Sequence, residues 1–209
     1  RASVKAIYDQ IKADLDSASK DLANVPGKIG STTVTIDAVN MMYARYYLDT
    51  KDYNNAAIYA LKVINSKAGY KISSNETDMA SEYSNDNGKE PIMQLPATLT
   101  ENGSGTNSTY TRCDFYQPLK DAKYPGAGIY QNPYFLPSKK LISQYEDKDL
   151  RLTQWFQNGS YPVYLAGSLY TSGITTFVKY LGNPNLNSDG IPNARQHVKP
   201  FLIGEAYLI

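Results

Sequence analysis

The chain has 209 residues, enough for one domain with a sizeable core, and its 21 Lys and Arg nearly balance its 20 Asp and Glu. A net charge of +1 provides no basic surface for nucleic acid, so no nucleic-acid partner is expected. A single cysteine, Cys113, excludes an internal disulfide framework, and a single histidine, His197, excludes a His-rich zinc site and argues against a Ser-His-Asp triad.

Both ends of the chain follow helical patterns. The chain opens on "RASVKAIYDQIKADL" and ends on "GEAYLI". No apolar run is long enough to cross a bilayer, and the start carries neither a signal peptide nor a lipid-attachment cysteine. Because the ends fall inside helical patterns, we expect the chain to be a piece of a longer protein.

Three amphipathic helices are predicted in the first third of the chain. The first, from Val4 to about Ala23, places apolar residues three and four positions apart along one face. The second begins near Thr35, where Thr35 or Asp37 can cap free N–H groups, and ends near Thr50. The third runs from about Tyr53 to Ser66.

The second and third predicted helices have the residue spacing of a tetratricopeptide unit. Ala44 and Ala56 are twelve residues apart, and Tyr47 lies nine residues before Ala56. The tetratricopeptide repeat has small, aromatic and small residues at these intervals. Small residues let two antiparallel helices cross closely, and the aromatic ring fills the gap beside them. The spacing predicts a rigid helical scaffold, with an ordinary helical hairpin as the alternative.

The stretch 73–197 is polar and rich in loops, with proline and glycine breaks. Its long Gly-, Ser-, Thr- and Asn-rich loop is of the kind that is functional or disordered in compact domains. A short strand is predicted in "KEPIMQLP", a helix from Ser138 to about Tyr145, and short strands at Pro162–Leu165 and Thr176–Tyr180. The last segment, Val198 to Ile209, is predicted to be a helix with Pro200 in its first turn.

Several segments form an ordered set along the chain: "IYDQIKADLDSASKDL", "TIDAVNMMYARYYLDTKDYNNAAIYALKVINS", "KEPIMQL", "PSKKLISQYEDKDLR" with Asp149 and Arg151, and "VKPFLIGEAYLI". This set resembles the SusD/RagB family of Bacteroidetes outer-membrane nutrient-binding lipoproteins and covers nearly the whole chain. Glu205 holds the position of a Glu of that family. Leu202 stands where many members carry Arg, so any pair that this Arg makes with a buried acid must be remade differently here.

The resemblance implies a mainly α fold, a SusD-like α/α superhelix of tetratricopeptide-like hairpins with a long loop-rich region and a few short strands. It implies a single domain over 1–209, with helices at 1–72, a ligand-side region at 73–197 and the start of a further helix at 198–209. It further implies a protein of the cell surface, lipid-anchored to the outer membrane through a segment outside this chain. Such a protein captures oligosaccharides or other nutrients for a SusC-like, TonB-dependent transporter, without catalysis or a cofactor.

Sugar binding needs aromatic rings for the apolar faces of pyranoses and fixed polar groups for their hydroxyls. The segment from Tyr110 to Tyr134 supplies both kinds of residue. The candidate ligand-binding residues are Tyr110, Arg112, Tyr116, Tyr124, Tyr130, Asn132 and Tyr134. A second candidate cluster consists of Trp155, Tyr161, Tyr164 and Tyr170, with core packing favoured for Trp155. The family's binding aromatics follow no fixed motif, so the resemblance assigns none of these residues.

Other patterns favour structural interpretations. Asp149 and Arg151 are expected to form a structural salt bridge rather than a catalytic pair, and nothing places two carboxylates across a cleft as a glycosidase requires. The stretch Asn185–Gly190 matches the start of a calcium loop. Gln196 stands where a bidentate Glu is expected, so an Asn-rich turn is favoured there and no metal site is predicted.

Three functions compete on this basis. The first is a surface glycan-binding protein that works with a transporter. The second is a helical-repeat module for protein–protein interaction, in which the tyrosine-rich loops are only structural. The third is an enzyme, for which the sequence offers no credible set of nucleophile and base.

Overall fold

The computed structural model describes residues 2–98, 113–116, 130–158, 162–171, 173–179, 182–186 and 196–209. The chain divides into two compact units. Unit 1 consists of Arg1–Ser73, Gly88–Pro96 and His197–Ile209, and unit 2 consists of Ser74–Asn87 and Ala97–Gln196. The single domain expected over 1–209 stays a prediction.

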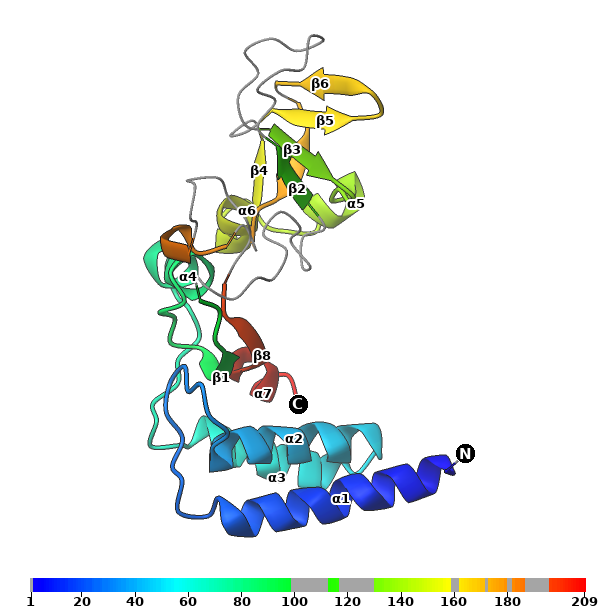
Figure 1. The fold of residues 1–209 in the computed structure, drawn as a ribbon, viewed down its shortest axis with the longest axis vertical. Helices are drawn as coiled ribbons and strands as arrows, with labels where there is room; N and C mark the ends of the chain where they lie inside the picture. The colour runs from blue at the N-terminus through cyan, green and yellow to red at the C-terminus, as the bar shows by residue number, and fades with distance from the viewer. Residues whose placement is uncertain are drawn as a thin grey trace. The chain divides into compact units, whose positions relative to one another are not determined.

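Unit 1 contains the three predicted helices, which lie side by side in Figure 1: α1 (Val4–Asp21), α2 (Ile36–Asp49) and α3 (Tyr53–Ile64). All three predictions are confirmed, and each end lies within two residues of the predicted one. The side chain of Ser3 caps α1 by accepting a hydrogen bond from Ala6 N–H at 3.1 Å. The side chain of Asp52 caps α3 in the same way, through Asn55 N–H at 3.2 Å.

The start of α2 departs from the predicted capping. Thr35 precedes the helix, but its side chain makes no capping hydrogen bond. Asp37, which is buried in the first turn, instead accepts hydrogen bonds from the hydroxyls of Ser66 at 2.5 Å and Tyr70 at 3.0 Å. Burial together with the nearby Asp37 carboxylate raises the pKa of Tyr70 well above its usual value. The carboxylate therefore ties the start of α2 to the segment that follows α3.

Helices α2 and α3 pack through the small residues that the sequence pattern singles out. Ala44 and Ala56 are fully buried and Ala60 is 2% exposed. The ring of Tyr47 stacks on Tyr59 of α3 with centroids 5.5 Å apart, as expected for an aromatic residue that fills the space beside the small ones. The predicted close contact of the two helices is confirmed.

The turn between α2 and α3 closes through a Schellman motif. Asp52 N–H donates to the carbonyl of Tyr47 at 2.8 Å, and Lys51 N–H donates to the carbonyl of Leu48 at 3.0 Å. Lys51 has φ of 63°, which lies in the left-handed region that glycine adopts most easily. The tight turn thus places a non-glycine residue in a costly conformation.

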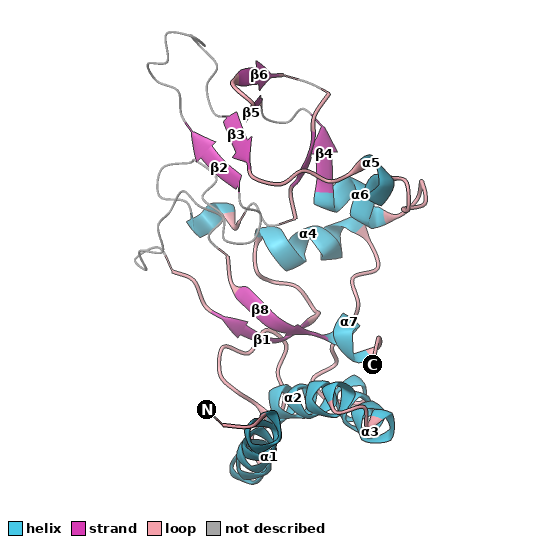
Figure 2. Ribbon diagram, turned by 90° about the vertical axis from the view of Figure 1, so that its right-hand side faces the viewer, coloured by secondary structure: helices cyan, strands magenta, loops and turns pink. Residues whose placement is uncertain are grey.

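The end of the chain corrects the sequence prediction. Val198–Leu202 forms strand β8 instead of a helix and pairs antiparallel with the predicted strand β1 (Pro91–Leu95); only Ile203–Ala206 is helical, as α7 (Figure 2). Pro200 lacks the N–H that a helix interior needs, and a strand of a two-stranded sheet tolerates it. Phe201 lies opposite Met93 and is 7% exposed, so strand pairing buries the apolar residues that suggested a helix.

Glu205 in α7 is paired with Arg45 of α2. The guanidinium of Arg45 holds the carboxylate with Nε on Oε1 and with Nη2 on Oε2 at 2.6 Å, and Nη2 also donates to the carbonyl of Pro200 at 2.8 Å. The same guanidinium lies 4.6 Å from the ring centroid of Phe201. Arg45 of α2 is thus the cation that pairs with Glu205.

Unit 2 combines short helices with small sheets. Its helices are α4 (Glu76–Ser84), α5 (Lys139–Ile142) and α6 (Leu150–Trp155), with a 3-10 turn, η1 (Pro184–Leu186). Its strands are β2 (Cys113–Tyr116), β3 (Tyr130–Pro133), β4 (Phe156–Asn158), β5 (Val163–Leu165), β6 (Ser168–Tyr170) and β7 (Thr175–Phe177). The predicted helix from Ser138 is shorter than expected, whereas the strands predicted near Pro162–Leu165 and Thr176–Tyr180 are present as β5 and β7.

Aromatic and cationic side chains pack together in unit 2. Phe156 of β4 lies 5.6 Å from Tyr145 and 5.3 Å from Phe177 of β7, measured between ring centroids. The ammonium group of Lys179 lies 3.8 Å from the ring of Trp155 and 4.9 Å from the ring of Tyr83 in α4. These contacts join α4, α6, β4 and β7. None of the helices in the described part of the chain has the length and apolarity needed to cross a bilayer.

Candidate functional site

The predicted ligand-binding residues gather on one antiparallel strand pair as far as they are described. Strands β2 and β3 pair so that Tyr116 lies opposite Tyr130 and Asp114 lies opposite Asn132. Tyr134 directly follows β3 and is 61% exposed. Tyr110, Arg112 and Tyr124 lie outside the described residues, and their binding role stays a prediction.

Strand β3 also pairs with β5, which joins the two candidate clusters. The order of this four-stranded sheet is β2-β3-β5-β6, and its strands lie next to one another in Figure 1. The β3–β5 pairing is parallel, with Gln131 opposite Val163. Tyr164 and Tyr170, from the second cluster, therefore belong to the same sheet as Asn132. Tyr161 of that cluster lies outside the described residues.

Burial along β3 separates two faces of the sheet. Successive residues of a strand point to opposite faces. Pro133 is buried, whereas Asn132 before it is half-buried and Tyr134 after it is exposed. Asn132 therefore lies on the side of β3 opposite Pro133, and the exposed Tyr134 directly follows the strand. We call this side of the four-stranded sheet, together with Tyr134, the tyrosine face.

The chemistry of the tyrosine face suits a neutral, hydroxyl-rich ligand. Tyr134 offers an apolar ring with a polar tip, and Asn132 offers an amide that both donates and accepts hydrogen bonds. Within the described parts of the chain, no group of three or more His, Cys, Asp or Glu residues is arranged to hold a metal ion. What the face can do chemically is stack on a ring and pair with its hydroxyl groups.

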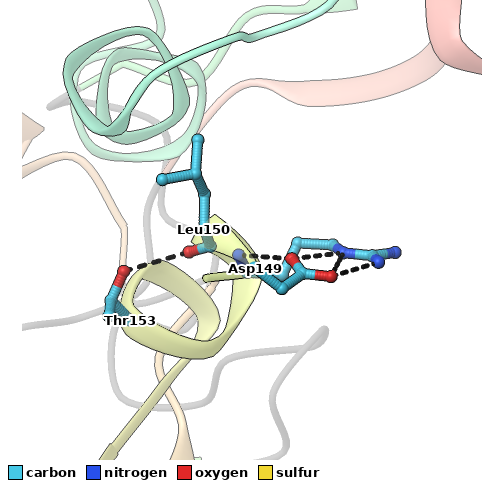
Figure 3. Close-up of polar contacts among 4 residues, drawn as sticks. Asp149, Leu150 and Thr153 are labelled. Atoms are coloured by element: carbon cyan, nitrogen blue, oxygen red, sulfur yellow. Dashed lines mark hydrogen bonds and ion pairs between the residues drawn. The ribbon is translucent and has the colours of Figure 1, made fainter. Parts of the chain in front are cut away.

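Asp149 and Arg151 form the predicted salt bridge, but in a different setting from the extended turn that the sequence suggested. Asp149 caps the start of α6 and accepts the backbone N–H of Arg151 at 2.9 Å (Figure 3). The Arg151 guanidinium approaches the same carboxylate through Nε at 2.9 Å and Nη2 at 2.5 Å. These hydrogen bonds from Arg151 lower the pKa of Asp149 to about 2. Its carboxylate thus caps a helix and holds an ion pair.

Thr153 makes a further hydrogen bond within the helix of Figure 3, because its hydroxyl donates to the carbonyl of Leu150 at 3.1 Å.

The calcium-loop pattern at Asn185–Gly190 is only partly described: Asn185 and Leu186 belong to η1, and 187–190 lie outside the described residues. Trp155, for which packing was favoured, is half-buried beneath the Lys179 ammonium.

One neighbour relation in the site was missed by sequence reasoning. The pairing of Gln131 with Val163 brings β3 beside β5 across more than 30 residues of chain, and no local pattern signals such a contact. The β5–β6 hairpin did carry a signal. In "VYLAGSLY", Ala-Gly separates two short apolar runs, which is the spacing of a two-residue hairpin turn.

Comparison of the sequence with protein-family models and with curated proteins finds no match. Solved structures do match. A SusD superfamily protein from Bacteroides thetaiotaomicron VPI-5482 is 19% identical with a TM-score of 0.67, over 100% of this chain and 42% of that chain. Surface glycan-binding protein A from Bacteroides thetaiotaomicron, in complex with laminarihexaose, is 18% identical with a TM-score of 0.65, over 96% and 48%.

Surface glycan-binding protein A from Bacteroides fluxus is 20% identical with a TM-score of 0.63, over 99% of this chain and 46% of that chain. At these identities the matches establish the fold. The chain has a SusD-like, mainly α fold, as the sequence predicted. It spans less than half the length of each of these solved structures.

Proposed function

We propose that this chain is a glycan-binding protein of the cell surface that delivers oligosaccharides to a SusC-like, TonB-dependent outer-membrane transporter. The observation that carries the proposal is the tyrosine face, where the half-buried Asn132 of β3 is followed closely by the exposed Tyr134. The fold is shared with a structure that holds laminarihexaose, a neutral oligosaccharide. In the proposed role the full-length protein is attached to the outer membrane by a lipid anchor.

The proposed mechanism is capture without chemistry. Tyrosine rings stack on the apolar faces of the sugar, and the amide of Asn132 pairs with hydroxyl groups. The proposed ligand-binding set remains Tyr110, Arg112, Tyr116, Tyr124, Tyr130, Asn132 and Tyr134. Neither a catalytic residue nor a cofactor is part of this proposal.

Isothermal titration against a panel of neutral and acidic polysaccharides, with product analysis on the same samples, tests the proposal. The expected result is saturable binding to at least one polysaccharide without new reducing ends. The substitutions Tyr124→Ala and Tyr130→Ala should each weaken that binding. Release of shorter products would instead establish an enzyme, and absence of binding to the whole panel would refute glycan capture.

A second candidate, a helical protein–protein interaction module, is favoured by one feature of α3. Ile58 and Leu61 are 50% and 52% exposed and lie three residues apart on one helix face. Exposed apolar residues on a helix are a common feature of docking surfaces. Under this alternative, Ile58→Asp with Leu61→Asp abolishes a protein complex while the chain shows no affinity for any sugar. Under the glycan proposal the same double substitution leaves sugar affinity unchanged.

A further inference from the structure

The register of the four-stranded sheet places Tyr164 beside Asn132. Gln131 of β3 and Val163 of β5 are partners in a parallel pair. The residues that follow them, Asn132 and Tyr164, are therefore also neighbours, on strands roughly 5 Å apart. Both residues are half-buried, so both are partly open to solvent.

Val163 and Tyr164 lie on opposite sides of β5 and differ in burial. Val163 is 3% exposed, and Tyr164, which follows it, lies on the opposite side of the strand. The same alternation separates buried Pro133 from Asn132 on β3. Because Gln131 and Val163 are register partners, the residues that follow them, Asn132 and Tyr164, lie on one side of the sheet. Tyr164 thus lies on the tyrosine face, next to a proposed ligand-binding residue.

The turn of the β5–β6 hairpin places Tyr170, which belongs to the second candidate cluster, on the side of the sheet opposite the tyrosine face. Ala166 and Gly167 have φ of 49° and 81°, as in a two-residue type I′ turn, which fixes the register of the strands it joins. In this register Tyr170 lies opposite Val163 and Leu169 lies opposite Tyr164. Tyr170 therefore belongs to the side of Val163, although it is 40% exposed.

We infer that Tyr164 is a further ligand-contacting residue, which extends the tyrosine face from β3 across β5, and that Tyr170 is not part of it. The inference rests on the proposed glycan binding. A face that spans two strands and carries Tyr134 and Tyr164 as well as Asn132 offers more than one aromatic ring. Its ligand class is an oligosaccharide of several sugar units rather than a single monosaccharide.

Titration of hairpin variants with the glycan that binds best in the panel, laminarihexaose being the first probe, tests the inference. Tyr164→Ala should weaken binding by at least about fivefold, the loss expected for a contact that matters to affinity. Tyr164→Phe keeps the ring and should retain most of the affinity. Tyr170→Ala is the matched control on the same hairpin and should leave the affinity unchanged. Shortening the ligand to a disaccharide should lower the affinity of the wild type.

The outcomes separate the inference from the function on which it rests. Wild-type binding that is weakened by Tyr134→Ala but not by Tyr164→Ala overturns the inference and leaves glycan binding intact. Wild type that binds no glycan of the panel overturns both. Hydrogen exchange of the unmodified chain covers the case in which Tyr164→Ala fails to fold. Ligand-induced protection of 162–165 supports the inference, and unchanged exchange there contradicts it.

Discussion

Arg45 shows how one side chain of a helix can fix a distant end of the chain. Its guanidinium engages the Glu205 carboxylate with two nitrogens and also binds the carbonyl of Pro200. The hydrogen bonds that Arg45 donates to the Glu205 carboxylate raise the pKa of Arg45 above its usual value, so the guanidinium stays charged. Their side chains are 40% and 31% exposed, so solvent screens part of the attraction.

A double-mutant cycle of Arg45→Ala and Glu205→Ala should give a coupling of about 1 kcal/mol, from urea unfolding of the four proteins. The two-pronged geometry places the value at the upper end for partly exposed pairs. Lys5 and Asp9 provide the control, because they form an i,i+4 pair whose side chains are 83% and 60% exposed. Equal coupling in both cycles would contradict the special role given to Arg45.

The lowered pKa of Asp149 makes the stability of the folded chain depend on pH. Its pKa lies at about 2 in the folded chain against a usual 3.8, and a carboxyl with a depressed folded pKa stabilises the fold only while it is ionised. This contribution is complete above about pH 4 and is lost as the pH falls toward about 2. Asp149→Asn removes it at every pH. The difference in melting temperature between wild type and Asp149→Asn should therefore shrink from pH 5 to pH 2.5. A difference that stays constant over this range would exclude the proposed ion pair.

At the scale of elements, the contact of α2 with α3 depends on small residues. Ala44 is fully buried, and a larger side chain there forces the helices apart. Ala44→Leu should lower the free energy of unfolding by about 1–3 kcal/mol, measured by urea denaturation. Met42→Leu is the control on the same helix, because Met42 is 38% exposed, and it should change stability by less than about 0.5 kcal/mol. A neutral Ala44→Leu would argue against close packing of the hairpin.

The turn that joins α2 to α3 offers a substitution that should stabilise the chain. Lys51 holds φ of 63°, and glycine relieves the steric cost of that conformation. Lys51→Gly should raise the free energy of unfolding by about 0.5–1 kcal/mol in the same assay. Lys67, also exposed, has no positive φ, so Lys67→Gly should lower stability. The opposite signs distinguish relief of strain from a general effect of glycine.

At the scale of the molecule, helices that bury one apolar face were predictable and sheet pairing was not. The period of apolar residues between Val4 and Ser66 gives three helices with nearly correct ends. Helix α4 lacks such a stripe, and its start depends on Asn75, which accepts a hydrogen bond from Asp78 N–H at 2.8 Å. At Val198–Leu202, pairing with β1 overrides a pattern that also fits a helix.

The candidate site follows the same division. Tyrosine, asparagine and glycine content marks the segment from Tyr110 to Tyr134 as a binding region, because those residue types suit sugars wherever they lie. Which residues share a face depends on register. The β3–β5 pairing, which joins Asn132 to Tyr164, involves residues too far apart in sequence for any local pattern. The register of the β5–β6 hairpin, which does carry a local signal, separates Tyr164 from Tyr170.

The two units separate the helical scaffold from the proposed site. Unit 1 holds the helical hairpin and the Arg45–Glu205 pair, whereas unit 2 holds the four-stranded sheet. Substitutions on the tyrosine face should therefore alter ligand affinity, and exposed tyrosines of unit 1 should not. Tyr134 and Tyr53 form a matched pair for this comparison, because they are 61% and 63% exposed and lie in different units.

The most direct test is isothermal titration of the wild type, Tyr134→Ala and Tyr53→Ala with the glycan of highest affinity, starting from laminarihexaose. Glycan capture by the tyrosine face predicts that Tyr134→Ala weakens binding by about fivefold or more and that Tyr53→Ala binds as the wild type does. Equal affinity of all three proteins would contradict the assignment of the site to this face. Absence of binding by the wild type to every glycan in the panel would contradict glycan capture itself.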